Sequence, residues 1–400
     1  MRHIALITLH TPTPTNFHGA SALPFHLIAF RPENVDMEVW SFNLNGCGIK
    51  QIDETAKKLG VKIHVLENPA WYRLLTHALI RLFLPKPVLS YLKLQDKTQK
   101  EIYDYLNSAN DSGIWIYGED IAGLARNFNG ISRVVTTPDC EAMYYHRVLA
   151  MEDIPLRKRL IARYALMYHR YAKMASCYPA DSKITYHLVG EEDKRFLQKL
   201  NPRLKTVFIH HPHYDVSLLP RVKVRADEKI RLLIAGRYDF TMSQAVNHAM
   251  SAILSLPGFV KNRYHITFLG RGWERCHANL VQNGFSAEHK GYVDDYAAEV
   301  SSHHIQLTPI AVGTGTKGKV LDAFANGLMV IGTPLALENI AVKNGEECIE
   351  YSSHEELTSW LEKLAADPAL IVDIASKGTQ AVLSHHSRKK IAKEFFDLFN

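Results

Sequence analysis

Three glycines and two lysines lie close together in the segment Gly313–Lys319, which reads Gly-Thr-Gly-Thr-Lys-Gly-Lys. The segment separates an apolar, strand-like run at 305–310 from a helix-like run at 320–326. Glycine lets the main chain approach an anion closely, the free N–H groups at the start of the next helix point toward it, and lysine adds positive charge. These residues therefore predict a binding site for a phosphorylated compound.

Two well-known nucleotide motifs fit this segment only in part. Residues 313–318 match the dinucleotide fingerprint Gly-x-Gly-x-x-Gly, and Glu338 follows about 20 residues later, where a ribose-binding acid is expected. That fingerprint normally follows the first strand of its domain, whereas several expected strands precede it here. Residues 313–319 nearly spell a P-loop, but Val320 stands where a Ser or Thr must hold magnesium. A glycine-rich turn with solvated lysines is a further alternative.

The elements that must position this segment alternate between strand-like apolar runs and amphipathic helical runs, which is the pattern of parallel sheets covered by helices. With 400 residues, 46% of them hydrophobic and 22% charged, the chain is long enough for two globular domains. Strands are expected at 3–9, 37–42, 61–66, 114–117, 132–136, 176–180, 206–210, 230–235, 264–269, 287–292, 305–310 and 329–333. Helices are expected at 20–29, 49–59, 243–254, 276–283, 319–326, 353–366, 368–384 and 388–399.

We therefore predict an α/β chain with two doubly wound, Rossmann-like domains. The first covers residues 1–212, a charged stretch with prolines at 213–229 forms a linker, and the second covers 230–384. The final helix, near 385–400, is a candidate to pack back onto the first domain.

Composition also bears on location and partners. The chain contains no run of about 20 apolar residues to span a bilayer, and the apolar start at 4–9 is too short for a secretion signal. Its five cysteines lie far apart without a Cys-x-x-Cys pair, so we expect them to be reduced, in a cytoplasmic protein. The net charge of +6 suits a nucleotide, a nucleic acid or an acidic membrane surface, and of these we do not expect nucleic acid.

The residues after the glycine-rich segment indicate which class of phosphorylated compound it binds. Residues 319–334 read Lys-Val-Leu-Asp-Ala-Phe-Ala-Asn-Gly-Leu-Met-Val-Ile-Gly-Thr-Pro, which places Asp322 one turn inside a helix whose N-terminus faces the phosphates. A carboxylate there is well placed to accept hydrogen bonds from ribose hydroxyls. With Pro309 before it, this stretch resembles the GT-B glycosyltransferases, especially the large family 4, which transfer sugars from nucleotide diphosphate sugars.

The resemblance covers most of the chain and implies a set of site residues. Gly236–Arg237 resembles the end of the first strand in the family's C-terminal domain, where the arginine contacts the donor pyrophosphate. Residues 268–272 resemble the glycine turn after the next strand, and residues 290–293 resemble the segment that contacts the nucleobase. Gly19, before a helix, resembles the glycine loop that faces the sugar phosphate across the cleft between the two domains. The implied donor-binding residues are Gly19, Arg237, Gly270, Tyr292, Gly313, Thr314, Gly315, Thr316, Lys317 and Asp322.

Two departures from the family pattern concern charge. Many members carry two glutamates eight positions apart, the first near the sugar hydroxyls and the second on the ribose, where this chain has Thr314 and Asp322. The resemblance therefore implies the ribose contact through Asp322, while Thr314 departs from the pattern at the sugar contact. A lysine also commonly follows the Gly-Arg pair, but residues 238–243 contain none. We hypothesise that Lys317 or Lys319 supplies this charge, and we expect Lys317→Ala to weaken donor binding.

The expected reaction needs stabilisation of a leaving diphosphate, which a GT-B fold supplies with cations and helix amides. The chain has no Asp-x-Asp motif, and its adjacent histidine pairs would diverge in a strand, so we expect no metal and no cofactor beyond the nucleotide sugar. Arg237, Lys317 and the loop amides are the expected catalytic groups. Asp139, after the strand at 132–136, is the first candidate for a general base, followed by Glu119 and Asp120. Asp139 could equally be a helix cap.

Two basic segments rich in aromatic residues, at 71–94 and 157–173, suggest contact with an anionic membrane surface. Core helices with solvated basic faces are an equal alternative. We expect the acceptor to be a glycan or a lipid-linked molecule, as in bacterial surface polysaccharide synthesis at the inner membrane face, with retention of the anomeric configuration favoured. The alternatives are an NAD(P)-dependent oxidoreductase that uses the Gly313 segment, or a non-catalytic protein that binds nucleotide sugars or glycans.

Overall fold

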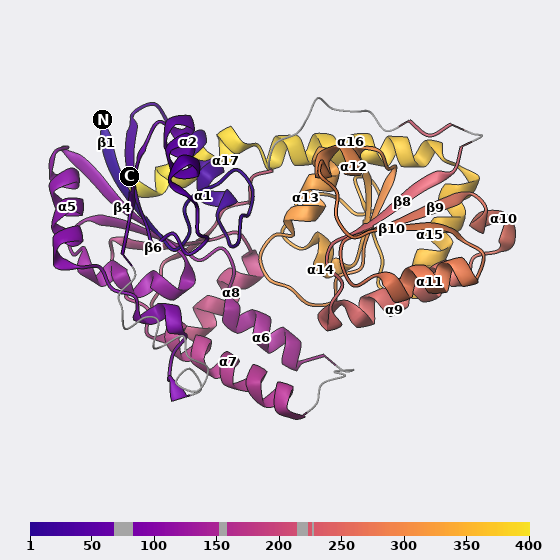
Figure 1. Ribbon diagram of the computed structural model, residues 1–400, viewed down its shortest axis with the longest axis horizontal. Helices are drawn as coiled ribbons and strands as arrows, with labels where there is room; N and C mark the ends of the chain where they lie inside the picture. The colour runs from indigo at the N-terminus through magenta and orange to yellow at the C-terminus, as the bar shows by residue number, and fades with distance from the viewer. Residues whose placement is uncertain (68–82, 152–157, 214–222, 226–227) are drawn as a thin grey trace. The chain divides into compact units, whose positions relative to one another are not determined.

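A computed structural model gives the fold, and it describes residues 1–67, 83–151, 158–213, 223–225 and 228–400. Its backbone contacts divide the chain into two compact units (Figure 1). Unit 1 consists of Met1–Leu149, Leu156–Pro212 and Arg388–Asn400. Unit 2 consists of Ala150–Pro155 and His213–Ser387.

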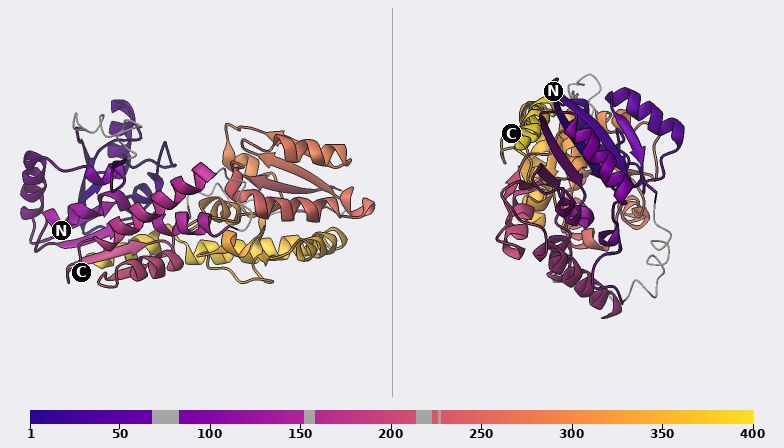
Figure 2. Two further views of the ribbon diagram at one scale, coloured as in Figure 1. Left: turned by 90° about the horizontal axis from the view of Figure 1, so that it is seen from below. Right: turned by 90° about the vertical axis from the view of Figure 1, so that its left-hand side faces the viewer.

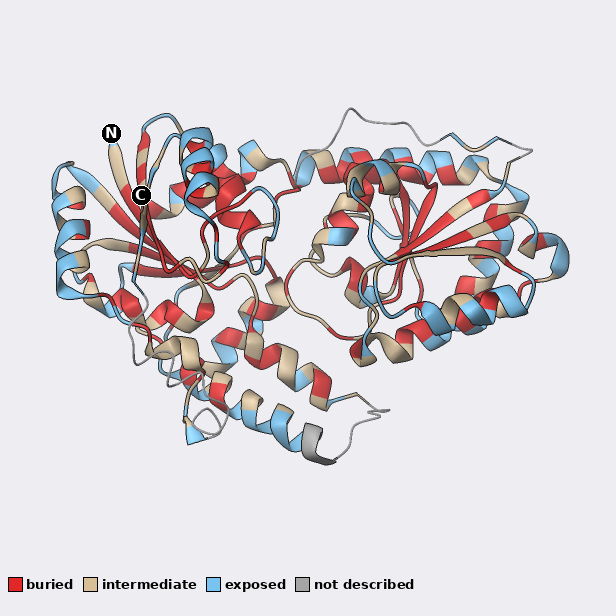
Figure 3. Cartoon of the chain, viewed as in Figure 1, coloured by how far each residue is buried: buried red, intermediate tan, exposed pale blue. Residues whose placement is uncertain are grey.

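Unit 1 contains a seven-stranded parallel sheet in the order β3-β2-β1-β4-β5-β6-β7. Its strands are β1 (Arg2–Thr8), β2 (Val35–Ser41), β3 (Lys62–Val65), β4 (Asp111–Tyr117), β5 (Ser132–Thr136), β6 (Ile184–Leu188) and β7 (Thr206–Phe208). The central strands are apolar runs because helices cover both of their faces, and residues 4–7 are fully buried (Figure 3).

Helices pack on both faces of this sheet. One face is covered by α1 (Ala22–Ala29), α2 (Ile49–Leu59) and the last helix, α17 (Arg388–Phe396). The other is covered by α5 (Asp96–Asn107), η2 (Glu119–Asn127), α7 (Lys158–Ser176) and α8 (Glu191–Leu200), and α6 (Glu141–Leu149) packs along α7. The rings of Phe395 and Trp115, with centroids 4.5 Å apart, join α17 to β4.

Unit 2 contains a six-stranded parallel sheet in the order β10-β9-β8-β11-β12-β13. Its strands are β8 (Ile230–Ala235), β9 (Tyr264–Leu269), β10 (Ser286–Lys290), β11 (Ile305–Thr308), β12 (Met329–Gly332) and β13 (Ile349–Glu350). One face is covered by α9 (Ser243–Leu254), α11 (Glu274–Gln282) and α15 (His354–Ala366). The other is covered by α12 (Tyr296–Ser301), α13 (Gly318–Ala325) and the end of the long α16 (Ala369–His385), which is yellow in Figure 2.

Short helical segments complete both units. They are η1 (Val88–Tyr91), η3 (Phe240–Met242), α10 (Gly258–Lys261), α14 (Pro334–Leu337) and η4 (Asp397–Phe399).

The predicted fold class, an α/β chain with two doubly wound sheets, is confirmed, and one predicted strand is wrong. Residues 176–180 do not form a strand, because Ser176 ends α7 and an irregular segment containing Pro179 follows. Proline cannot donate to a strand ladder, so the next strand, β6, begins only at Ile184. A short apolar run does not by itself distinguish the end of a buried helix from a strand.

Candidate functional site

The strand order of unit 2 reverses between β8 and β11. From β8 the chain continues outward to β9 and β10, and from β11 it continues the other way to β12 and β13. In doubly wound sheets, ligands bind outside the carboxyl ends of the strands at this reversal. The carboxyl end of β8 leads into Gly236–Arg237, here called the Gly236 turn, and that of β11 leads toward residues 313–317, here called the Gly313 loop.

The Gly236 turn is fixed by close backbone packing. Gly236 and Gly270 have φ angles of 130° and 123°, and a Cβ atom on Gly270 would lie 2.3 Å from the carbonyl oxygen of Gly236. The indole N–H of Trp273 donates to that same oxygen at 2.7 Å. Only glycine fits this contact, and the rigid turn presents an exposed Arg237.

The Gly313 loop turns Lys317 inward. The Lys317 ammonium donates to the Gly315 carbonyl oxygen at 3.0 Å and lies 3.3 Å from a carboxylate oxygen of Glu338. Both side chains are largely buried, at 8% and 14% exposed. Glu338 thus binds the loop lysine, where the dinucleotide alternative expected a ribose-binding acid. The positive charge of Lys317 is balanced within the protein.

Lys319 lies differently, one position inside α13. Its ammonium nitrogen lies 3.0 Å from the point where a Cβ atom of Gly236 would stand, so it covers the Gly236 turn. Gln306, fully buried on β11, donates to the Lys319 carbonyl oxygen at 3.2 Å and holds the first turn of the helix. The structure therefore places the second of the two candidate lysines against the Gly236 turn, whose next residue is Arg237.

Asp322 follows one turn later on α13. Burial raises its pKa to about 7, although the charge of Lys319 acts in the opposite direction. Loss of hydration lowers the pKa of Lys319, and Asp322 opposes that shift in turn. A carboxyl group that titrates near neutral pH beside a cation is typical of a functional site.

The other residues implied by the family resemblance lie in loops of one unit or the other. Gly270 and Tyr292 follow the carboxyl ends of β9 and β10, and the Tyr292 side chain is 80% exposed. Thr314 and Thr316 lie partly buried in the Gly313 loop. Gly19 lies in unit 1, after β1, against the imidazole of His10.

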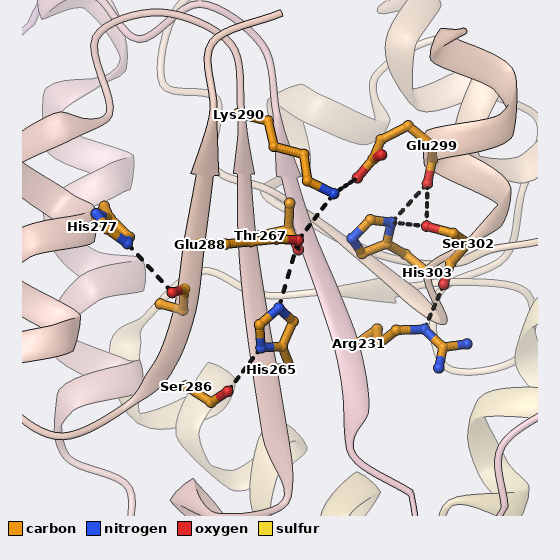
Figure 4. A network of polar contacts seen from close by, with 11 residues as sticks. Arg231, His265, Thr267, His277, Ser286, Glu288, Lys290, Glu299, Ser302 and His303 are labelled. Atoms are coloured by element: carbon orange, nitrogen blue, oxygen red, sulfur yellow. Dashed lines mark hydrogen bonds and ion pairs between the residues drawn. The ribbon is translucent and has the colours of Figure 1, made fainter. Parts of the chain in front are cut away.

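A polar network holds the segment that carries Tyr292 (Figure 4). The Lys290 ammonium, at the end of β10, lies 2.8 Å from Glu299 on α12 and 3.1 Å from Glu288. Glu288, Glu299 and His303 are the one group in the described part of the chain whose ligand atoms are close enough to share a metal ion. Lys290 contacts both carboxylates, so the protein supplies its own cation there.

In unit 1, Asp139 lies partly buried between β5 and α6. Glu119, which follows β4, reaches the same segment and accepts a hydrogen bond from the Glu141 N–H at 2.9 Å. Burial raises the pKa of Glu119 well above its usual range, that of Asp120 to about 6 and that of Glu141 to about 7. The three sequence candidates are thus near one another in the fold, and Glu141 is an acidic neighbour that the sequence did not single out.

The two basic segments of the sequence are described only in part. Residues 71–82 and 157 lie outside the described residues, as do the side chains of 158–160. Within α7, Arg163 and Lys173 are exposed, whereas Arg170 is only 6% exposed. In the described part of the chain, no helix is long and apolar enough to cross a membrane.

Comparisons with known proteins bear on the fold and on the family of part of the chain. Residues 248–397 match the family described as glycosyl transferase-like. Among solved structures, sucrose-phosphate synthase from Thermosynechococcus elongatus is similar over 100% of this chain and 98% of its own, with a TM-score of 0.68 and 14% identity. HepE from Anabaena, in complex with UDP-glucose, is similar over 98% of both chains, with a TM-score of 0.61 and 10% identity. The chain has the GT-B fold, and its residues 248–397 match a glycosyl transferase-like family.

The predicted resemblance to GT-B glycosyltransferases of the family 4 type is thereby confirmed. WaaG, a glycosyltransferase involved in lipopolysaccharide biosynthesis, is similar over the whole of both chains, with a TM-score of 0.55 and 13% identity. None of the curated proteins compared with this chain matches it.

Proposed function

We propose that this GT-B glycosyltransferase binds a nucleotide diphosphate sugar at the carboxyl edge of the unit 2 sheet and transfers its sugar to a glycan or lipid-linked acceptor. The observation that carries the proposal is the position of Lys319 over the Gly236 turn, with Asp322 one helical turn away. The Gly236 turn, which carries Arg237, and the first turns of α13, which carry Lys319 and Asp322, thus lie together where the strand order reverses. This set suits a pyrophosphate and an adjacent ribose.

In this proposal the donor pyrophosphate lies on the amides of the Gly313 loop, between Arg237 and Lys319. Asp322 accepts hydrogen bonds from the ribose hydroxyls. When the bond between the sugar and the diphosphate breaks, the fixed cations stabilise the charge that develops on the leaving oxygen. The mechanism needs no metal or cofactor, and Lys317, paired with Glu338, shapes the loop.

The acceptor is assigned to unit 1, where Asp139 lies at the carboxyl edge of the sheet. If the anomeric centre inverts, Asp139 takes the acceptor's proton. If the configuration is retained, which we favour, Asp139 orients the acceptor hydroxyl and no dedicated base is needed.

The donor is tested first with uridine nucleotides, because the solved structures of HepE contain UDP and UDP-glucose. UDP, GDP and NAD are titrated by calorimetry, and hydrolysis of a panel of nucleotide sugars is then measured. The proposal expects binding of a nucleoside diphosphate and slow hydrolysis of its sugar. Binding of NAD alone would support an oxidoreductase, and nucleotide binding without any turnover would support a binding protein.

We further propose a cytoplasmic location with contact to the inner membrane face, where a lipid-linked acceptor in surface polysaccharide synthesis would be found. The exposed Arg163 and Lys173 of α7 support it, as does the lipopolysaccharide pathway of WaaG. The protein should sediment with vesicles that contain anionic lipid, and the double variant Arg163→Glu, Lys173→Glu should sediment less. Equal sedimentation with neutral vesicles would contradict membrane contact through charge.

A further inference from the structure

Residues 137–141 of unit 1, here called the Asp139 loop, connect β5 to α6 and carry the candidate catalytic carboxylate. Two buried carboxyl groups contact the backbone of this loop. The N–H of Cys140 donates to Asp193 Oδ1 at 2.8 Å, and the N–H of Glu141 donates to Glu119 Oε2 at 2.9 Å. Asp193 is fully buried and Glu119 is 7% exposed.

The two carboxyl groups come from different parts of unit 1. Glu119 begins η2 directly after β4, and the Tyr178 hydroxyl donates to its carbonyl oxygen at 3.0 Å. Asp193 lies in the first turn of α8, after β6. The position of the Asp139 loop is therefore set by segments on both sides of β5.

The loop is also held before and after Asp139. The N–H of Thr137 donates to the His187 carbonyl oxygen at 3.0 Å, and Pro138 has a fixed φ. Cys140 is 1% exposed and packs in an apolar cluster with Ala142 and Met143. The two neighbours of Asp139 in sequence, Pro138 and Cys140, are thus both held in place by the rest of unit 1.

The first backbone amides of a helix do not require buried carboxyl groups as hydrogen-bond acceptors. A Ser, Thr or Asn side chain satisfies the first amides of a helix at little cost, whereas a buried carboxyl group must be compensated. Burial raises the pKa of Glu119, and the hydrogen bond from Glu141 acts in the opposite direction. Both amides are also used inside the protein, so they are not available to bind a substrate phosphate.

We propose that Glu119 and Asp193 are positioning residues that hold the Asp139 loop in its reactive geometry. This inference rests on the proposed function, because it requires that Asp139 contact the reacting groups. Displacing a reacting group by about 1 Å can lower a rate about 100-fold, so the loss of residues that hold this loop in place should lower kcat. It should leave donor affinity unchanged, since the proposed donor residues lie in unit 2.

The test compares Glu119→Ala and Asp193→Ala with Glu119→Gln and Asp193→Asn, which keep a side-chain oxygen as acceptor. Asp181→Ala is the matched control, because Asp181 accepts from the Lys183 N–H at 2.8 Å and pairs with Arg133 at the opposite, amino edge of the sheet. The measurements are kcat for UDP-glucose, or for the panel donor that turns over fastest, the Kd for UDP, the thermal midpoint, and amide exchange at Cys140 and Glu141.

The alanine variants should lower kcat by about 10- to 100-fold, with the UDP Kd within about twofold, and should speed exchange of the two amides. The Gln and Asn variants should recover most of kcat. In an Asp139→Asn background, Glu119→Ala should cause no further loss of kcat.

The inference is overturned if the alanine variants lose no more kcat than Asp181→Ala at an equal loss of thermal midpoint, or if exchange of the two amides is unchanged. If the alanine variants do not fold, a loss of kcat in Glu119→Gln and Asp193→Asn as large as the loss in Asp139→Asn overturns it instead, because both variants keep the acceptor oxygen. Failure of the proposed function is a separate result, in which the wild type binds no nucleoside diphosphate or turns over no nucleotide sugar. Amide exchange then still shows whether Glu119 and Asp193 hold the Asp139 loop.

Discussion

Lys317 and Lys319 are two positions apart in sequence but have different partners. Lys317 contacts Gly315 and Glu338, whereas the Lys319 ammonium lies over the Gly236 turn. We therefore assign the donor pyrophosphate to Lys319 rather than to Lys317. This changes the expectation from the sequence that Lys317→Ala would weaken donor binding.

Lys319→Ala should weaken binding of UDP-glucose by about 10-fold or more, because it removes a hydrogen bond between charged groups worth about 1.5–3 kcal/mol. Lys317→Ala should mainly lower thermal stability, since it removes the ion pair between Lys317 and the largely buried Glu338. Lys377→Ala, on α16 and paired with Asp373, is the control. Calorimetry and thermal unfolding separate the two effects. A larger loss of affinity for Lys317→Ala than for Lys319→Ala would contradict the assignment.

Asp322 should make donor binding depend on pH. Its pKa is about 7 in the free protein, and ribose hydroxyls bind the ionised form, so bound donor lowers that pKa. Affinity for UDP-glucose should therefore rise between pH 6 and 8 and level off above the pKa. Asp322→Asn should bind more weakly at high pH and lose this dependence. A wild-type affinity that is constant over the same range would count against the ribose contact.

At the scale of the elements, the site depends on turns that only glycine can form. Gly270→Ala places a Cβ atom 2.3 Å from the Gly236 carbonyl oxygen, so the backbone must move, at a cost of about 1–3 kcal/mol. Donor affinity and thermal stability should both fall. Gly258→Ala is the matched control, because a Cβ atom there meets no atom within 4 Å and the residue lies outside the segments assigned to the donor. Equal behaviour of the two variants in calorimetry would show that the turn is not rigid.

The buried strand β6 should make unit 1 sensitive to acid. His187 is 1% exposed, and burial lowers its pKa to about 3, below the usual value of 6.5. Between these values the unfolded chain binds the proton and the folded chain does not, so lowering the pH destabilises the fold by up to about 1.4 kcal/mol per pH unit.

The buried carboxyl groups with raised pKa values act in the opposite direction, so a comparison with His187→Gln isolates the histidine contribution. Relative to the wild type, His187→Gln should gain stability in urea as the pH falls from 7 to 5. A difference between the two proteins that does not change with pH would exclude this role.

The sequence predicts these elements unevenly, for physical reasons. Apolar runs identify the central strands, because buried parallel strands are covered by helices on both faces. The helix after the Gly313 loop is also evident from its composition. The side-chain partners are not, since Glu338 and Asp193 become neighbours of Lys317 and Cys140 only through the sheet topology. No local pattern in the sequence contains that information.

At the scale of the whole molecule, the account assigns donor binding to unit 2 and acceptor binding to unit 1. The fold of both units and the family of residues 248–397 support a glycosyltransferase. Unit 2 alone carries Arg237, Lys319 and Asp322, so nucleotide binding should survive changes at Asp139 and turnover should not.

The measurement that tests the central claim most directly is turnover of a panel of nucleotide sugars, followed by mass spectrometry of the released nucleotide in the presence of EDTA. The account predicts that at least one nucleotide diphosphate sugar is converted to its nucleoside diphosphate, and that Arg237→Ala reduces this rate at least 10-fold. If no nucleotide sugar is consumed while the folded protein binds NAD, the assignment of the site is contradicted.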